Sequence, residues 1–237
     1  MSEGSRSFAR RKLRDARGAV EAAQALLHHT LEVAASAGDV HVCAPLGSDA
    51  ATIAVERGYT WHRQTGGALG GRIAAALAAV HAAAPGRAVL VIGDDCPGLV
   101  EESLVEAATA LEHGAQTAVG CARDGGFWLL GLASFDPRFA SSLAATVEWG
   151  TARAFVSLCR FLKASFPGEP FLVGELTDVD APEDLAEAVR AAEDPRLKRI
   201  LQAVKPGLAP REALDDEWIP PGARSPAEAL PRPPPSR

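Results

Sequence analysis

Two adjacent aspartates follow the most apolar short run of the sequence. The run spans residues 88–92 and reads Ala-Val-Leu-Val-Ile, which predicts a buried strand, and the next five residues are Gly-Asp-Asp-Cys-Pro. Ligands of open parallel sheets bind beyond the carboxyl ends of the strands, and carboxylate oxygens suit Mg²⁺ or Mn²⁺. The pair Asp94 and Asp95 therefore predicts a metal site, with helix capping by one of them as an equally weighted alternative.

Two further junctions carry clustered acids. Residues 123–126 read Arg-Asp-Gly-Gly between two predicted strands, and residues 178–180 read Asp-Val-Asp ahead of a helix expected to open at Pro182. Glycines let a ligand approach the backbone closely, but Asp-Gly is also the commonest hairpin signal. Taken alone, the first junction favours a hairpin and the second favours helix capping.

A glycine-rich loop at residues 66–72, Gly-Gly-Ala-Leu-Gly-Gly-Arg, leads into a predicted helix. Backbone N–H groups and the helix dipole make such a loop a good anion site. The spacing matches neither the P-loop nor the dinucleotide-binding fingerprint, and the chain has no H-E-x-x-H or G-x-S-x-G motif. These absences disfavour a P-loop NTPase, a dinucleotide dehydrogenase, a zinc hydrolase and a serine esterase.

Short apolar runs that alternate with helical patterns must position these residues. The pattern predicts helices at 20–34, 71–84, 104–111 and 155–166, and strands at 40–44, 88–92, 117–119 and 127–132. This alternation is typical of a parallel sheet with crossover helices. We therefore expect an α/β fold with an open, mainly parallel, Rossmann-like sheet and helices on both faces.

The length of 237 residues allows one large domain with an appendage. Residues 206–237 contain nine of the 17 prolines, and proline denies hydrogen bonds to both helices and sheets. We expect a folded domain over residues 8–205 and a disordered, proline-rich tail over residues 206–237.

Charge and hydropathy limit the partners. The net charge of −6 argues against nucleic acid as the main partner, although the first 17 residues carry six cations and only two carboxylates. No apolar run reaches the 18 residues of a membrane span, and the N-terminus lacks a stretch of signal-peptide type. We expect a cytoplasmic protein that binds neither nucleic acid nor membranes.

Five blocks in sequence order resemble one bacterial family, the GT-A-type glycosyltransferases that include proteins labelled as arsenosugar biosynthesis enzymes. This family belongs to the nucleotide-diphospho-sugar transferase superfamily, and the similarity covers about residues 60–190. The blocks are Gln64 with Leu69-Gly70-x-Arg72, residues 92–99 (Ile-Gly-Asp-Asp-Cys-Pro-Gly-Leu), Gly120 with residues 124–132, Trp149-Gly150-Thr151, and residues 178–185.

The resemblance implies a GT-A fold and a set of site residues. Asp95 would hold Mg²⁺ or Mn²⁺ against the diphosphate of a nucleotide donor, with Gly93 beside it. Arg72, aided by the N–H groups of Gly70 and Gly71, would stabilise the leaving group, because bond cleavage develops negative charge there. Leu69 would belong to the same binding site. The segment Asp124-Gly125-Gly126 would face the sugar or a small-molecule acceptor, and Asp124 joins Asp95 as a catalytic candidate.

The N-terminus departs from the family, which opens with an apolar strand and a loop that ends in K-T-R-L. Here only Lys12 and Arg14 correspond to that pair of cations, and the loop is missing. We therefore expect a gap or a different filling at the centre of the sheet. The leading function is metal-dependent glycosyl transfer from a nucleotide sugar. The alternatives are nucleotidyl transfer from a nucleoside triphosphate, as in 2-phospholactate or molybdenum-cofactor guanylyltransferases, and a non-catalytic binding protein.

Overall fold

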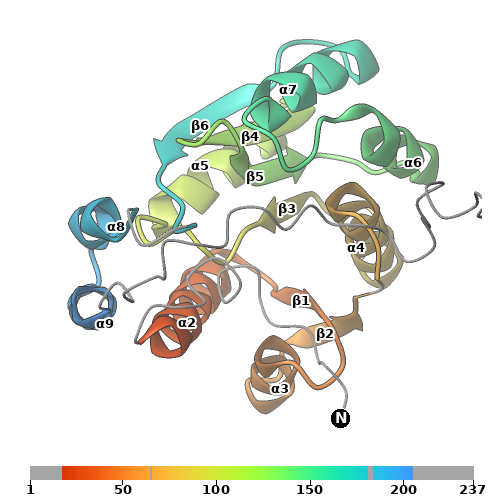
Figure 1. Ribbon diagram of the computed structural model, residues 1–237. Coiled ribbons are helices and arrows are strands. Elements are labelled where there is room, and N and C mark those ends of the chain that lie inside the picture. The colour runs from red at the N-terminus through yellow and green to blue at the C-terminus, as the bar shows by residue number, and fades with distance from the viewer. Residues whose placement is uncertain (1–17, 65, 181–183, 205–237) are drawn as a thin grey trace, which may run out of the picture. The chain divides into compact units, whose positions relative to one another are not determined.

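The computed structural model describes residues 18–64, 66–180 and 184–204. Figure 1 shows the arrangement of their helices and strands. The helices are α2 (Ala19–Ala37), α3 (Asp49–Glu56), α4 (Leu69–Ala83), α5 (Glu101–Glu112), α6 (Pro137–Thr146), α7 (Ala154–Ser165), α8 (Leu185–Ala191) and α9 (Pro195–Ala203). The strands are β1 (His41–Ala44), β2 (Thr60–Arg63), β3 (Val89–Ile92), β4 (Thr117–Ala122), β5 (Phe127–Leu132) and β6 (Phe171–Leu176).

The strands of the described residues form two open sheets. The parallel strands β1 and β2 make the smaller sheet, and the larger sheet has the order β3-β5-β4-β6. In the larger sheet β5 runs antiparallel to β3 and β4, whereas β4 and β6 are parallel. Strands β3, β4 and β6 therefore share one direction, and their carboxyl ends meet at one edge of the sheet.

Helices cover both faces of the larger sheet. On one face α4, α6 and α7 pack against it, and their core includes Leu77, Leu143 and Leu158 together with Val119 and Leu130 of the strands. Alternate strand residues point to opposite faces, so the strand neighbours Ala118 and Leu129 join the other core.

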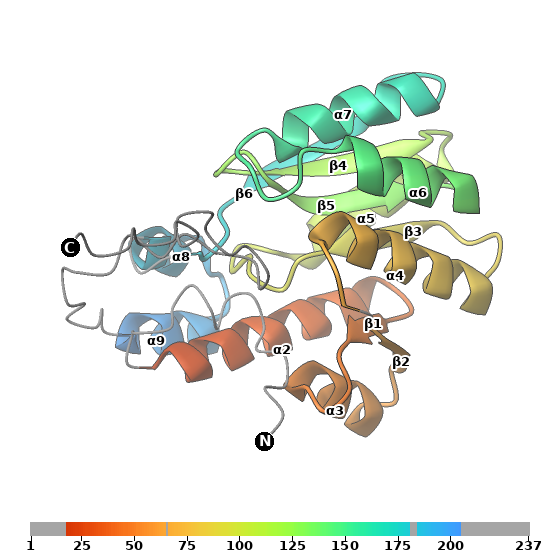
Figure 2. The same cartoon turned by 45° about the vertical axis from the view of Figure 1, so that its right-hand side comes forward.

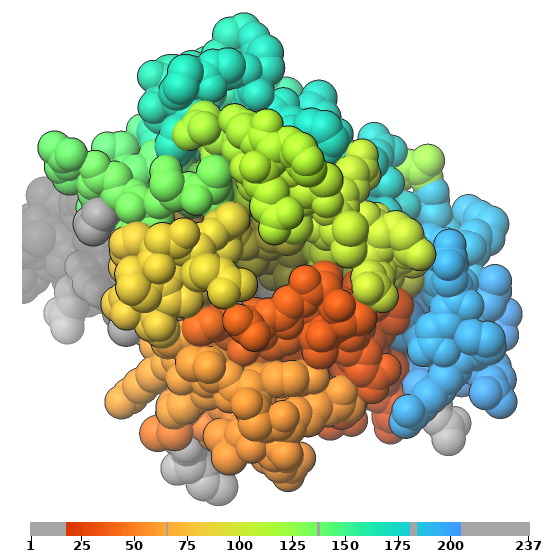
Figure 3. Space-filling model, turned by 180° about the vertical axis from the view of Figure 1, so that it is seen from behind, coloured from red at the N-terminus to blue at the C-terminus, as the bar shows by residue number. Residues whose placement is uncertain are grey.

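The second face is covered by α5 and the end of α2. Leu104 and Leu111 of α5 pack with Ala118 and Leu129, and Val33 of α2 joins them. Figure 3 shows α2 and α5 side by side on this face. The opening part of α2 also packs against α8 and α9, and Figure 2 shows α9 alongside it.

The expected fold class is confirmed, because the chain is an α/β protein with open sheets and helices on both faces. In the described residues, β1 pairs only with β2 and β3 pairs only with β5. The expected nucleotide contacts of Lys12 and Arg14, the helix start at Pro182 and the tail 206–237 all lie outside the described residues, so these remain predictions. No helix in the described part of the chain is both long and apolar enough to cross a membrane.

Candidate metal centre

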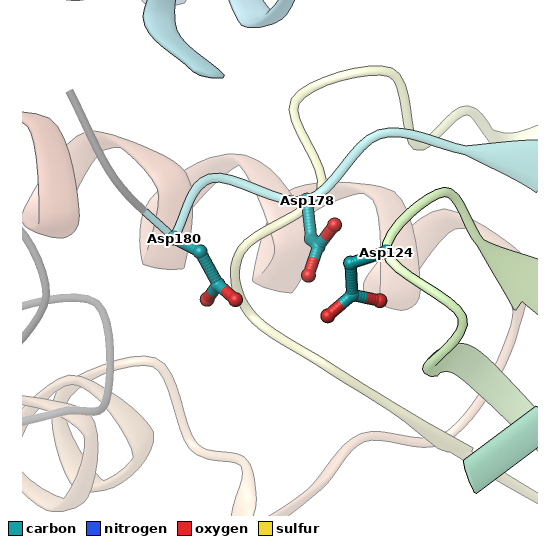
Figure 4. A group of neighbouring side chains, drawn as sticks. All are labelled: Asp124, Asp178 and Asp180. Carbon is teal, nitrogen blue, oxygen red and sulfur yellow. The ribbon is translucent and has the colours of Figure 1, made fainter. Parts of the chain in front are cut away.

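Three aspartates gather at the edge where β3, β4 and β6 end. Asp124 follows β4, and Asp178 and Asp180 follow β6. Each offers one carboxylate oxygen, and these oxygens lie within 4.8 Å of one another. Figure 4 shows the three side chains projecting into the same region from two different loops. Asp124 is exposed, and the other two are half-buried.

Backbone hydrogen bonds hold these loops together. The N–H of Val179 donates to the carbonyl oxygen of Asp95 at 3.0 Å, so the loop after β6 is tied to the loop after β3. The N–H of Arg123 donates to the carbonyl oxygen of Leu176 at 3.1 Å, which ties the hairpin after β4 to the end of β6. These main-chain hydrogen bonds tie the three junctions to one another.

The Asp124 turn requires its glycines. The N–H of Gly126 donates to Asp124 Oδ1 at 2.7 Å, so one carboxylate oxygen stabilises the turn. Gly125 has a φ of 89°, and a Cβ there would overlap the carbonyl oxygen of Ala152. The N–H of Phe155 donates to the carbonyl oxygen of Gly125 at 3.0 Å. This junction is the hairpin that its sequence favours, and it also presents Asp124 to the acidic group.

Asp95 lies beside the acidic group rather than within it. A Cβ added to Gly93 would lie 2.8 Å from Asp95 Oδ1, so the Asp95 carboxylate packs against this glycine. The Cys96 thiol donates to the same oxygen at 3.9 Å. Burial, followed by the charges of Asp95 and Asp178, raises the pKa of Cys96. Burial and the raised pKa both disfavour the thiolate, the form in which a cysteine acts as a nucleophile. Burial also raises the pKa of the neighbouring Asp94 above 3.8.

The glycine-rich segment opens α4 as expected. No side chain caps this helix, and the N–H groups of its first turn have no partner within it. Gly70 is buried, and a Cβ there would overlap the indole ring of Trp149. Its glycine identity therefore follows from packing against Trp149, whereas Leu69 and Gly71 are exposed.

Arg72 lies one turn into the same helix and is half-buried. Its Nε is buried and has no hydrogen-bond partner among the described residues. Arg72 lines a cavity of about 20 Å³ together with His62 and Gln64. A space of this size holds one water molecule, so the side chain is partly enclosed rather than extended into solvent.

The loop at residues 149–152 contacts both the start of α4 and the Asp124 turn. Trp149 covers Gly70 on α4, its ring meets the Phe127 ring edge-on at 5.8 Å between centroids, and Ala152 packs against Gly125. Gly70 and Gly125 are thus linked through this loop, and Gly93, Asp95 and Asp124 gather at the carboxyl edge.

Asp178 and Asp180 are the members of the acidic group that the sequence analysis assigned to helix capping. Asp184, the N-cap residue of α8, makes no side-chain hydrogen bond to that helix, and its Oδ2 accepts from the N–H of Asp180 at 2.9 Å. The helix start expected at Pro182 lies outside the described residues, so helix capping by Asp178 or Asp180 stays a prediction. The sequence signal for their proximity is the Asp-x-Asp spacing, since residues i and i+2 of an extended chain point the same way.

This chain is similar to one bacterial protein family and to a solved structure. The bacterial family described as "Uncharacterized protein conserved in bacteria (DUF2064)" matches residues 19–151. The chain belongs to the DUF2064 family. The match ends within the loop at residues 149–152, so it includes Asp95 and Asp124 but not Asp178 and Asp180. No curated protein matches this DUF2064 chain.

Among solved structures, this DUF2064 protein is similar to one from Desulfovibrio desulfuricans G20 that is described as a "putative nucleotide-diphospho-sugar transferase". The TM-score is 0.68 at 20% sequence identity, over 84% of this chain and 89% of the other. A likeness at this identity establishes the shared fold. The narrower resemblance to arsenosugar biosynthesis enzymes stays a prediction.

Proposed function

We propose that this DUF2064 protein is a divalent-metal-dependent transferase that takes a glycosyl group from a nucleotide sugar to a small-molecule acceptor. The observation that carries the proposal is the group Asp124, Asp178 and Asp180 at the carboxyl edge of the larger sheet. Ligands of open α/β sheets bind at such an edge. The structural similarity to a protein described as a nucleotide-diphospho-sugar transferase supports the choice of donor.

The residues of the acidic group fit Mg²⁺ or Mn²⁺. Both ions take oxygen ligands, and oxygens on opposite sides of Mg²⁺ lie about 4.2 Å apart. The carboxylate oxygens, all within 4.8 Å of one another, need only a small side-chain movement to meet one ion. A bound ion would supply positive charge that stabilises the leaving nucleoside diphosphate.

The chain's own groups would orient the donor and acceptor. Asp124 is fixed at Oδ1 by the Gly126 N–H, which leaves Oδ2 to face the ligand. Asp95 lies in the loop that is hydrogen-bonded to Val179, and in this proposal it would contact the metal or the sugar. The exposed start of α4, with the Leu69 and Gly71 backbone and the Arg72 cation nearby, would receive the diphosphate through N–H groups and charge.

A thermal-shift screen tests this proposal directly. Nucleotide sugars and nucleoside diphosphates are added with and without Mn²⁺. A ligand that binds only the native state raises its stability, by about 2.7 kcal/mol at a concentration 100 times its Kd. We expect at least one nucleotide sugar to raise the melting temperature only when Mn²⁺ is present.

Asp124→Asn should remove this Mn²⁺-dependent shift. Asp39→Asn is the matched control, because Asp39 is 85% exposed and lies near Arg87, away from the acidic group. A protein that binds Mn²⁺ but is shifted by no nucleotide would instead be a metal-binding relative without transferase activity. If nucleotides raise the melting temperature equally with and without Mn²⁺, and equally in the wild type and Asp124→Asn, the ligand site lies elsewhere.

A further inference from the structure

The opposite edge of the larger sheet carries a cavity that the proposed transferase function does not use. Strand β5 runs antiparallel to β3 and β4, so its last residue, Leu132, pairs with their first residues, Val89 and Thr117. The chain after β5 therefore lies at the edge away from the acidic group. Between α6 and α7 at this edge is a cavity of about 480 Å³. Small-molecule sites span about 300–1,000 Å³.

Phenylalanine rings form the apolar walls of this cavity. Four phenylalanines line it, and Phe139 of α6 contacts two of them. Its ring centroid lies 5.2 Å from that of Phe161, with planes 42° apart, and 5.1 Å from that of Phe166, with planes 62° apart. Tilted rings at these distances are a favourable aromatic arrangement, and they suit a further flat aromatic ring.

Two of the serines that line the cavity, Ser142 and Ser165, present acceptors to it. Ser142 Oγ donates to the carbonyl oxygen of Arg138 at 3.3 Å, and Ser165 Oγ donates to that of Phe161 at 2.8 Å. Each hydroxyl proton is thus committed within its own helix, which leaves the oxygen lone pairs for a ligand.

The charged residues at the cavity, Arg138 and Asp136, pair with each other. Arg138 donates from Nε and Nη2 to the carboxylate of Asp136, at 3.1 Å and 2.8 Å to Oδ2. The two charges offset each other, so the cavity has no net preference for a cation or an anion. A ligand that complements it brings an apolar ring and its own hydrogen-bond donor.

We propose that this cavity binds a small neutral aromatic molecule that carries an O–H or N–H group, of the phenol or indole class. The ring lies against the phenylalanines, and the donor reaches the hydroxyl oxygen of Ser142 or Ser165. This site is separate from the acidic group, and it requires no metal.

Ligand-observed NMR with phenol and anisole tests the proposal. The two molecules share a ring, but anisole has no donor. We expect phenol to bind about fivefold more tightly than anisole, the ratio that one net hydrogen bond gives. Indole should bind as phenol does. No binding of phenol or indole, or equal binding of phenol and anisole, would overturn the proposal.

Three variants locate the site. Ser142→Ala combined with Ser165→Ala removes the acceptors, so phenol should bind no better than anisole. Ser142→Trp, at an exposed position of α6, should fill the cavity and abolish binding of both molecules. Ser36→Ala is the matched control, because Ser36 Oγ makes a similar bond to the Val33 carbonyl oxygen on α2. Phenol binding that survives Ser142→Trp in a folded protein would place the ligand elsewhere and refute the assignment.

Discussion

The two edges of the larger sheet are built by different means. The acidic edge is the one that carries Asp124, Asp178 and Asp180. There, backbone hydrogen bonds join the loops, as from Val179 to Asp95 and from Arg123 to Leu176. The aromatic edge is the opposite one, next to the cavity. There, side-chain contacts hold the elements together, and the Phe139 ring contacts those of Phe161 and Phe166. One antiparallel strand, β5, makes this division possible, because it carries the chain from the acidic edge to the aromatic one.

This difference predicts how each edge tolerates change. At the acidic edge, we expect exchange of the Asp124 carboxylate for the isosteric amide to lower the free energy of unfolding only slightly, because the amide oxygen can still accept from the Gly126 N–H. At the aromatic edge, the same side chains line the cavity and pack the helices together. A substitution that alters the cavity there therefore also lowers the free energy of unfolding.

Substitution of Gly125 should have the largest effect on stability. Gly125→Ala forces a side chain into a φ of 89° and against the carbonyl oxygen of Ala152, and we expect a loss of about 3 kcal/mol. Gly150→Ala is the control, because its φ of 69° carries the same strain but no atom lies within 4 Å, so about 1 kcal/mol is expected. Urea denaturation measures both. Equal losses of unfolding free energy in the two variants would mean that the close approach of the Ala152 carbonyl oxygen to Gly125 adds nothing to the cost of the substitution.

A smaller loss is expected at the aromatic edge. Phe139→Leu removes two ring contacts while it keeps most of the apolar volume, and we expect a cost of about 2 kcal/mol. Phe171→Leu, a half-buried position in the α5 core, should cost less. If Phe139→Leu proves as mild as Phe171→Leu in urea denaturation, the ring contacts do not hold this edge.

The smallest effect concerns the two-stranded sheet, which belongs to neither edge. His41 Nδ1 and His62 Nε2 share a hydrogen bond of 2.8 Å, and burial, then the proximity of His41, lowers the pKa of His62 below 6.5. The unfolded state therefore takes up a proton more readily than the folded state as the pH falls below about 6.5, so stability decreases there.

The melting temperature should thus fall modestly as the pH drops through this range, and His62→Gln should reduce the fall. His113→Gln, at the exposed end of α5, serves as the control. A fall of the same size in the His62 variant would assign the effect to other groups.

Much of the fold is predictable from periodicity. The strand at 127–132 agrees residue for residue, and the helix expected at 155–166 is found at Ala154–Ser165. Strands β2 and β6 were not predicted. The first reads Thr-Trp-His-Arg, with no apolar run, and the second is interrupted by Gly174 and Glu175. Both strands depend on pairing with a neighbour, which a local pattern does not reveal.

The site was less predictable than the fold. The junctions at 94–95 and 124–126 could be located as carboxyl ends of strands, because apolar runs mark where strands stop, whereas 178–180 was located only as the segment ahead of the helix expected at Pro182. Which carboxylates meet could not, since that depends on contacts between loops such as Val179 to Asp95. The structure groups Asp124 with Asp178 and Asp180, and the role assigned to Asp95 remains a prediction.

Titration of Mn²⁺ into the wild-type protein and Asp124→Asn by calorimetry tests the central claim most directly. The amide keeps the oxygen that accepts from Gly126 at 2.7 Å, so the turn should persist while one of three charges is lost. We expect one Mn²⁺ site in the wild type and an affinity at least about tenfold lower in the variant, with an unchanged melting temperature of the metal-free protein to within a few degrees. Equal affinity in the two proteins would show that the acidic group is not the metal centre.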